Sequence, residues 1–81
     1  MKRTLYTIEE LKQLKVGDEV YIEYKHYEHG TFKEITKVQE INESEVYFDD
    51  GYDFPFLDET TLETEFAVQD DGDNTFKVFK I

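Results

Sequence analysis

Cysteine is absent from the sequence, and its absence removes two common ways of stabilising a small domain. The chain can form neither disulfide bridges nor the thiolate metal sites that hold many mini-proteins together. A secreted protein of this size usually depends on such bridges, so we predict a cytoplasmic protein. Neither a metal ion nor another cofactor is expected.

Long apolar runs are also absent. Apolar residues occur in uninterrupted runs of two or three at most, whereas a membrane-spanning helix needs about 20. Residues 1–6 contain too few apolar side chains for a signal peptide. We therefore expect a soluble protein without a membrane segment.

Charge and aromatic rings are the features that the chain has in abundance. Its 81 residues carry a net charge of −11, beyond the roughly 2 to 8 units that keep a small domain soluble. Seven Phe and six Tyr are spread along the whole length, and disordered acidic tails lack such residues. We therefore predict a single folded domain over residues 1–81, small enough that its core approaches the lower limit for stability.

A helix is predicted over residues 8–14. Thr7 and Glu10 have the spacing of a capping box, in which each side chain accepts a hydrogen bond from the backbone N–H of the other residue. Gly17 follows where a helix would end. The segment has one narrow apolar stripe, so the helix must pack on a larger element.

From Asp18 onward, apolar and polar residues alternate as they do in half-buried strands. Clusters of Asp, Asn and Gly between these segments, such as Asp50-Gly51, indicate turns. Five strands are predicted, at residues 19–27, 31–41, 45–49, 64–69 and 75–81.

Two segments are less regular. Four apolar residues recur every three positions, as in a helix, namely Phe32, Ile35, Val38 and Ile41. The β-branched residues of this segment nevertheless favour a strand in which a β-bulge shifts the alternation. Residues 52–61 contain Pro55, which cannot donate a hydrogen bond within a sheet. That segment is predicted to be a loop or an edge segment.

These elements predict a mainly β (α+β) fold, with a short N-terminal helix followed by about five antiparallel strands. A small barrel or a strongly bent sheet is expected, because a short open sheet exposes its edges. Residues 14–22, LKVGDEVYI, resemble the entry into the first strand of SH3-like small barrels, and residues 45–51, EVYFDDG, resemble their third strand and its turn. The resemblance implies an SH3-like barrel and carries no function with it.

Basic residues are missing from one half of the chain. Residues 1–37 carry seven basic and seven acidic residues, whereas residues 38–76 carry thirteen acidic residues and no lysine or arginine. Because this stretch contains strands, we expect its carboxylates to form one rigid negative surface with aromatic rings among them. For any single turn, the simpler explanation is that Asp is favoured there for its hydrogen bonds to the backbone.

Spacing within the acidic stretch suggests where a partner binds. Residues two apart on a strand share a face, so Glu43 with Glu45, and Glu63 with Glu65, are expected to form rows of negative charge. The residues predicted to contact the partner are Glu43, Glu45, Asp49, Asp50, Asp53, Asp58, Glu59, Glu63, Glu65, Tyr47, Tyr52 and Phe54.

No pattern of catalytic or metal-binding residues stands out, so a non-enzymatic protein is predicted. Ser44 is the one serine, and no histidine is near it in the sequence. His26 and His29 are three apart, which on a strand places them on opposite faces, and zinc needs further ligands. The aspartate-rich turns do not follow the order of an EF-hand loop. Direct binding of nucleic acid is opposed by the negative charge.

The negative charge predicts a basic protein as the partner. We expect an inhibitor or DNA mimic that occupies the basic surface of a nucleic-acid-binding protein. In size, acidity and lack of cysteine the chain resembles small phage-encoded acidic proteins that disable host proteins, which implies the cytoplasm of a host cell. The alternative is an SH3-like peptide-binding or scaffolding module that captures a basic or Pro-rich segment through Tyr21, Tyr24, Tyr27 and Tyr47. A self-assembling structural component is a third hypothesis, which the net charge disfavours.

Overall fold

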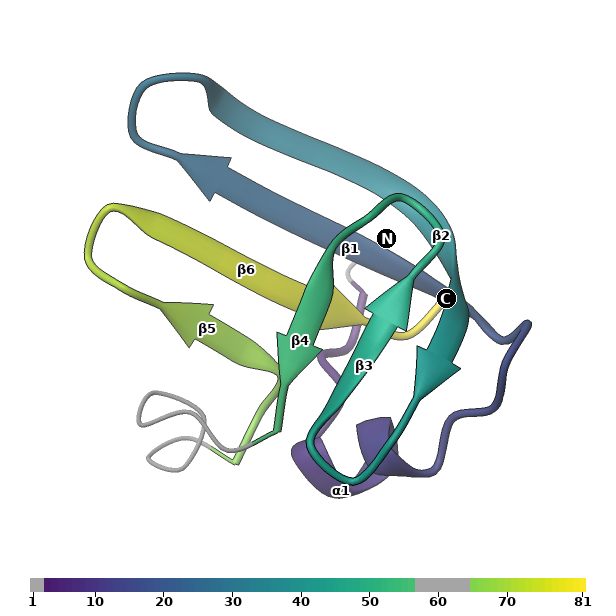
Figure 1. The fold of residues 1–81 in the computed structure, drawn as a ribbon. Coiled ribbons are helices and arrows are strands. Elements are labelled where there is room, and N and C mark those ends of the chain that lie inside the picture. Colours follow the sequence, from purple (N-terminus) through teal and green to yellow (C-terminus); the bar gives the residue numbers. More distant parts are fainter. Residues whose placement is uncertain (1–2, 57–64) are drawn as a thin grey trace.

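The computed structural model describes residues 3–56 and 65–81. Within these residues, six antiparallel strands form one sheet in the order β4-β3-β2-β1-β6-β5 (Figure 1). Their bounds are β1 (Glu19–His26), β2 (Gly30–Ile41), β3 (Glu45–Phe48), β4 (Asp53–Pro55), β5 (Val68–Asp70) and β6 (Asn74–Phe79).

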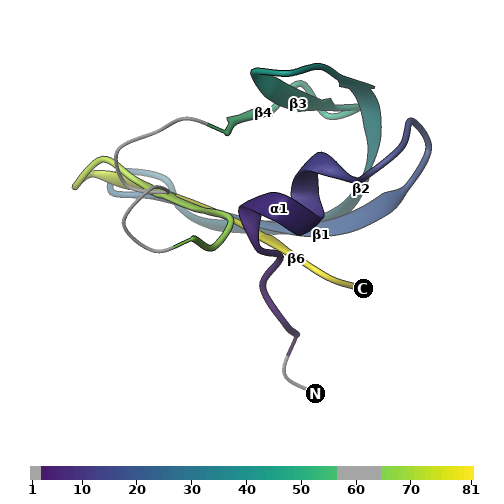
Figure 2. The ribbon, with the colours of Figure 1, turned by 90° about the horizontal axis from the view of Figure 1, so that it is seen from below.

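The sheet curls into a nearly closed barrel. Figure 2 shows β1 and β6 in one layer and the β3–β4 hairpin folded over it, with α1 at one end of the space between them. The prediction of a mainly β fold in a small barrel or strongly bent sheet is confirmed, and the shape is compatible with an SH3-like barrel. The described residues contain one strand more than the five predicted.

The helix α1 (Ile8–Lys12) begins as the sequence predicts and ends earlier. Both hydrogen bonds of the capping box are present, each 3.1 Å long, between Thr7 and Glu10. The predicted end at residue 14 is wrong. The N–H groups of Gln13 and Leu14 donate to carbonyls three residues back instead of four, which tightens the last turn and ends the α-helix at Lys12.

Strand β2 provides the bend that closes the sheet. Its first part pairs with β1, from Gly30 opposite His26 to Lys37 opposite Glu19, and its last part pairs with β3. The register shifts between Val38 and Glu40, so the strand contains a bulge as predicted, but the shift comes after Val38 and leaves Ile35 exposed on the outer face. A bulge bends its strand and increases its twist, so one continuous strand can belong to both layers.

The remaining differences from the predicted bounds lie at turns and at the sheet edge. Strands β1 and β3 each end one residue earlier than predicted, and β6 covers Asn74–Phe79 instead of 75–81. Residues 53–55 form the edge strand β4, where Pro55 is tolerated because no further strand is paired with it in the described sheet. Strand β5 starts at Val68, and Glu65, with φ of 63°, interrupts extended backbone before it.

A continuous apolar core fills the barrel. The buried side chains come from α1, from every strand except β5, and from Phe56 and Ala67. The rings of Phe48 and Phe54 lie 6.4 Å and 5.9 Å from the ring of Phe76, so the two layers meet through these three residues. In the described part of the chain, no helix is long and apolar enough to cross a membrane.

Candidate partner-binding surface

The outer face of the β3–β4 hairpin collects carboxylates around one tyrosine. Strand alternation turns the apolar residues of both strands into the core and leaves Glu45, Tyr47 and Asp53 outside. Tyr47 lies opposite Asp53 of β4 on one side and opposite Glu40 of β2 on the other. These four residues, Glu40, Glu45, Tyr47 and Asp53, are called the carboxylate face.

The carboxylates of the carboxylate face raise the pKa values of their neighbours. The Tyr47 hydroxyl donates a 2.5 Å hydrogen bond to Glu45 Oε1. This bond, burial, and the charges of Glu45, Asp53 and Glu40 raise the pKa of Tyr47. Loss of hydration, followed by the hydrogen bond and charge of Glu45, raises the pKa of Asp53. Proton loss is therefore disfavoured at both groups, as expected where like charges are held together.

A second carboxylate pair lies on the inner side of the sheet. The hydrogen bond that the protonated Glu34 carboxyl donates to Asp50, burial, and the charge of Asp50 raise the pKa of Glu34 to about 7. Glu34 Oε1 is buried and accepts no hydrogen bond. The neighbouring Tyr52 also has a raised pKa, caused by burial and then by the charges of Asp50, Tyr24 and Glu34. Glu34 was not predicted from the sequence to contact a partner.

Aromatic rings surround this pair. Tyr24 and Tyr52 stack with ring centroids 5.2 Å apart, and Phe32 lies 6.3 Å from Tyr52. Phe32 remains 45% exposed, so the cluster reaches the surface. Tyr24, Phe32, Glu34, Asp50 and Tyr52 are together called the aromatic end of the barrel.

The aspartates of the β5–β6 turn have a structural role. Asp70 Oδ1 accepts the Gly72 N–H at 2.8 Å, and Asp71 Oδ1 accepts the N–H groups of Asp73 and Asn74 at 3.0 Å and 2.7 Å. The hydrogen bonds from Asn74 and Asp73 lower the pKa of Asp71. For this turn, the preference of Asp for backbone hydrogen bonds accounts for the sequence.

The structure divides the predicted contact residues among several places. Glu45, Tyr47 and Asp53 meet on the carboxylate face, and Asp50 and Tyr52 meet at the aromatic end. The β2–β3, β3–β4 and β5–β6 turns, which carry further acids, point to different sides of the barrel (Figure 1). The described carboxylates therefore form separate groups, and the expected single negative surface is not found among them.

Several of the predicted partner-contact residues lie elsewhere than expected, and three lie outside the described residues. Phe54 is fully buried, because alternation in β4 turns it into the core, so its prediction as a contact residue is wrong. Glu43 is exposed in the turn before β3, so it forms no strand row with Glu45. Asp49 and Glu65 are exposed. Asp58, Glu59 and Glu63 lie outside the described residues.

The four tyrosines of the peptide-module hypothesis are also separated. Tyr21 packs on Phe79, and the Arg3 guanidinium lies 4.2 Å above its ring. Tyr24 belongs to the aromatic end, and Tyr47 belongs to the carboxylate face. Tyr27, in the β1–β2 turn, is 66% exposed. A peptide contacting all four at once is therefore not supported.

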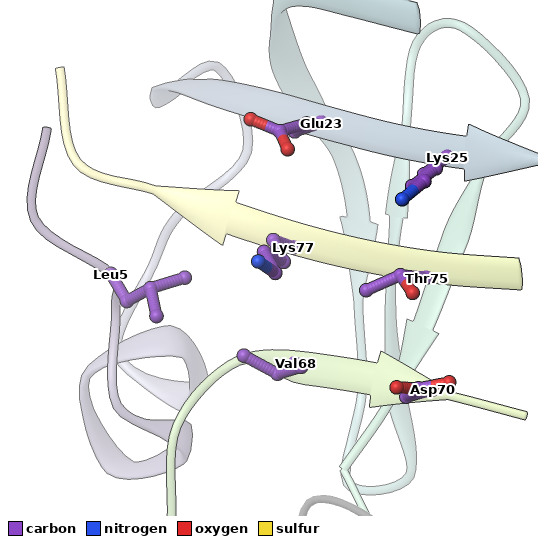
Figure 3. Close-up of a pocket in the computed structure, with 7 residues that line it drawn as sticks. All are labelled: Leu5, Glu23, Lys25, Val68, Asp70, Thr75 and Lys77. Carbon is purple, nitrogen blue, oxygen red and sulfur yellow. The ribbon is translucent and has the colours of Figure 1, made fainter. Parts of the chain in front are cut away.

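A shallow hollow of about 410 Å³ occupies the outer face of β1, β6 and β5 (Figure 3). It is lined by Leu5, Glu23, Lys25, Val68, Asp70, Thr75 and Lys77. Two lysines and two carboxylates contribute equal and opposite charge, so this face adds nothing to a negative surface. The hollow brings Lys25 and Lys77, which are far apart in the sequence, to one side of the barrel.

The histidine pair is closer than the sequence suggests. The rings of His26 and His29 stack at 4.5 Å, because residues 27–29 form a turn rather than continuing the strand. The expectation of opposite faces is therefore wrong. His26 Nδ1 accepts the backbone N–H groups of Glu28 and His29, which stabilises the turn. In residues 3–56 and 65–81, no three His, Asp or Glu side chains converge as a metal site.

Comparisons with protein-family models, with curated proteins and with solved structures found no match to this chain. The resemblance to phage-encoded acidic proteins therefore has no support beyond composition. The fold class is shown by the structure itself.

Proposed function

We propose that the protein is a non-enzymatic acidic binding protein that occupies the basic surface of a nucleic-acid-binding protein in the cytoplasm of a host cell. In this role it acts as an inhibitor or DNA mimic of the phage host-takeover type. The observation that supports the proposal is the carboxylate face, where Glu40, Glu45 and Asp53 surround Tyr47 on three adjacent strands.

The carboxylate face has the properties that a basic partner requires. Adjacent strands are about 4.8 Å apart, so Glu40 and Asp53 flank Tyr47 across roughly 10 Å. In the part of the chain that the structure describes, no lysine or arginine forms an ion pair with these carboxylates. A partner that supplies cations relieves their repulsion, and the long-range field accelerates its approach.

Two variants with equal net charge test the proposal. The face variant carries Glu40→Gln, Glu45→Gln and Asp53→Asn, and the control variant carries Glu19→Gln, Glu28→Gln and Asp73→Asn, three exposed acids elsewhere. Each variant and the wild type are immobilised, exposed to bacterial lysate at low and at high salt, and the captured proteins are identified by mass spectrometry. The affinity of each captured basic protein is then measured with and without duplex DNA.

The expected result is a basic, nucleic-acid-binding protein that binds wild type and control alike, binds the face variant more weakly, and is displaced by duplex DNA. Removing the three charges of the carboxylate face should lower the association rate by about tenfold or more at low salt. Equal binding by the two variants would show that net charge alone acts. Failure to capture any basic protein at low salt would also contradict the proposal.

The second candidate function is a peptide-binding module for a basic or Pro-rich segment. One observation favours it, namely the partly exposed rings at the aromatic end, since peptide-binding barrels use aromatic grooves. This module should depend on one or two rings as hot spots, whereas the inhibitor should weaken cumulatively with each lost carboxylate. Duplex DNA should compete with the inhibitor's partner and leave a peptide in place.

A further inference from the structure

We propose that the aromatic end of the barrel binds an arginine side chain of the basic partner, with the guanidinium on the exposed rings and hydrogen-bonded to Glu34 and Asp50. The identity of the partner rests on the proposed function, whereas the site itself can be tested with a small arginine peptide.

The topology assembles this site from three separate segments. The register of β1 and β2 places Phe32 opposite Tyr24 and Glu34 opposite Ile22 on the inner face. The turn between β3 and β4 then brings Asp50 and Tyr52 onto that face, with the Tyr52 ring stacked on Tyr24. The β1–β2 hairpin extends beyond the β3–β4 hairpin (Figure 1), and Phe32 remains 45% exposed near its end.

The site contains a buried hydrogen-bond acceptor that has no donor. Among the described residues, two buried side-chain atoms lack a hydrogen-bond partner, Glu34 Oε1 and Asn74 Oδ1. Glu34 Oε1 belongs to the proposed site, whereas Asn74 lies on β6, opposite His26, and borders a separate cavity of about 120 Å³ that Tyr24 also lines. A buried acceptor without a donor costs free energy, so a ligand rich in donors is favoured here.

The charge at the site also favours a cation. Glu34 and Asp50 repel each other, and the groups that face Glu34, namely Asp50, Tyr52 and Tyr24, include no cation. Alternation turns Lys25 and Lys33, the neighbours of Tyr24 and Glu34 in the chain, to the outer face of the sheet. No ion pair is formed by Glu34 or Asp50 within the described part of the protein.

Arginine fits this combination better than other cations. Its planar guanidinium stacks on aromatic faces and presents donors in a fork that suits carboxylates. Lysine presents a strongly hydrated point charge and gains less from the rings. A nucleobase could stack, but its phosphate would meet two carboxylates. A divalent metal ion lacks a third convergent ligand among the described residues.

The test is an NMR titration of the full chain with N-acetyl-Gly-Arg-Gly-amide and with the matching lysine peptide. The variants are Phe32→Leu and Glu34→Gln. Their controls are Phe66→Leu, with the same 45% exposure, and Glu19→Gln, which removes the same charge from an exposed strand position. Circular dichroism of each variant verifies that the fold is retained, and the ring signals of Tyr24, Phe32 and Tyr52 report binding.

The arginine peptide should shift these ring signals and bind about two- to fivefold more tightly than the lysine peptide. Phe32→Leu should weaken binding by a similar factor, and the two controls should not. In the wild type, binding should strengthen as pH rises through about 7, since Glu34 then ionises; in Glu34→Gln this dependence should disappear.

Two results would overturn the inference. Shifts confined to Glu45, Tyr47 and Asp53 would place arginine on the carboxylate face, which contradicts this site and leaves the proposed function standing. Absence of any shift at the aromatic end, with folded protein and excess peptide, would contradict it as well. Binding at the aromatic end supports the site even if duplex DNA fails to displace the captured partner, a result that contradicts only the proposed function.

Discussion

The β3–β4 and β5–β6 hairpins both carry aspartates, but their carboxylates have opposite surroundings. In the β5–β6 turn, backbone N–H groups donate to Asp70 and Asp71, and the pKa of Asp71 falls. On the β3–β4 hairpin, the pKa of Asp53 rises through lost hydration and the proximity of Glu45. Equal formal charge therefore stabilises one hairpin and opposes the folding of the other.

The difference bears on function. A carboxylate that already accepts backbone hydrogen bonds has less to gain from a partner's lysine or arginine. A carboxylate that repels its neighbours gains both the new ion pair and relief from repulsion. In the proposed function, a basic partner would therefore gain most at the β3–β4 hairpin and at the neighbouring Glu34–Asp50 pair, because of the position of these acidic residues rather than their number.

The largest expected effect is a loss of stability when the contact between the two hairpins, formed by Phe54 of β4 and Phe76 of β6, is removed. Phe54→Ala should destabilise the protein by about 3 to 5 kcal/mol, since it leaves a cavity beside Phe76. Such a loss approaches the whole stability of many small domains. Urea unfolding followed by circular dichroism measures it, and Phe66→Ala, at a 45% exposed position, is the control. Equal losses in both variants would contradict the assignment of Phe54 to the core.

Local sequence signals predicted much of this framework. The Thr7 and Glu10 capping box lies within four residues, and the β-branched content of residues 31–41 was sufficient to predict a bulged strand. The strand predicted at residues 45–49 is also present as β3, one residue shorter. These signals succeed because each depends on neighbours in the chain.

Other features depend on contacts between distant segments. Glu34 meets Asp50 only because β2 bends and the β3–β4 turn folds back over it, and nothing near Glu34 in the sequence indicates that. One weak signal was present, since Phe32, Glu34 and Thr36 share a face with the core residue Val38. Phe54 was assigned wrongly because residues 52–61 were predicted to be either a loop or an edge segment, and without a definite strand the alternation could not be used.

The next largest effect is the pH dependence of stability. The folded pKa of Glu34 is about 7 against a usual value of 4.5, so the folded state keeps a proton that the unfolded state loses. Stability from this group is complete below 4.5 and is lost as pH rises through about 7. The lowered pKa of Asp71 acts in the opposite sense, since its contribution is present above 3.8 and is lost as pH falls.

Glu34→Gln should therefore remove much of the decline in stability between 4.5 and about 7. Urea midpoints at a series of pH values, compared with Glu19→Gln, measure this change. If the two variants show the same slope as the wild type, Glu34 does not share its site with Asp50.

Replacing one aspartate by asparagine in each hairpin tests whether the two carboxylates affect stability in opposite directions. Asp53→Asn should stabilise the fold by roughly 0.5 kcal/mol, since it removes a like-charge neighbour of Glu45. Asp71→Asn should destabilise it, because charge-assisted hydrogen bonds from two backbone N–H groups become neutral ones. Thermal and urea unfolding of both variants give the signs. Changes of the same sign would show that net charge, and not its surroundings, decides.

Salt provides the smallest and most general test. With a net charge of −11, the wild type should melt at a higher temperature as salt rises, because ions screen repulsion between exposed carboxylates. Repulsion on the carboxylate face should supply a disproportionate share of the gain. The face variant with Glu40→Gln, Glu45→Gln and Asp53→Asn should therefore gain less from salt than the control variant with Glu19→Gln, Glu28→Gln and Asp73→Asn. Differential scanning calorimetry over a salt series measures these melting temperatures. A melting temperature of the wild type that does not change with salt would mean that the carboxylates are too dispersed to repel one another. A basic partner would then have no concentrated charge to bind.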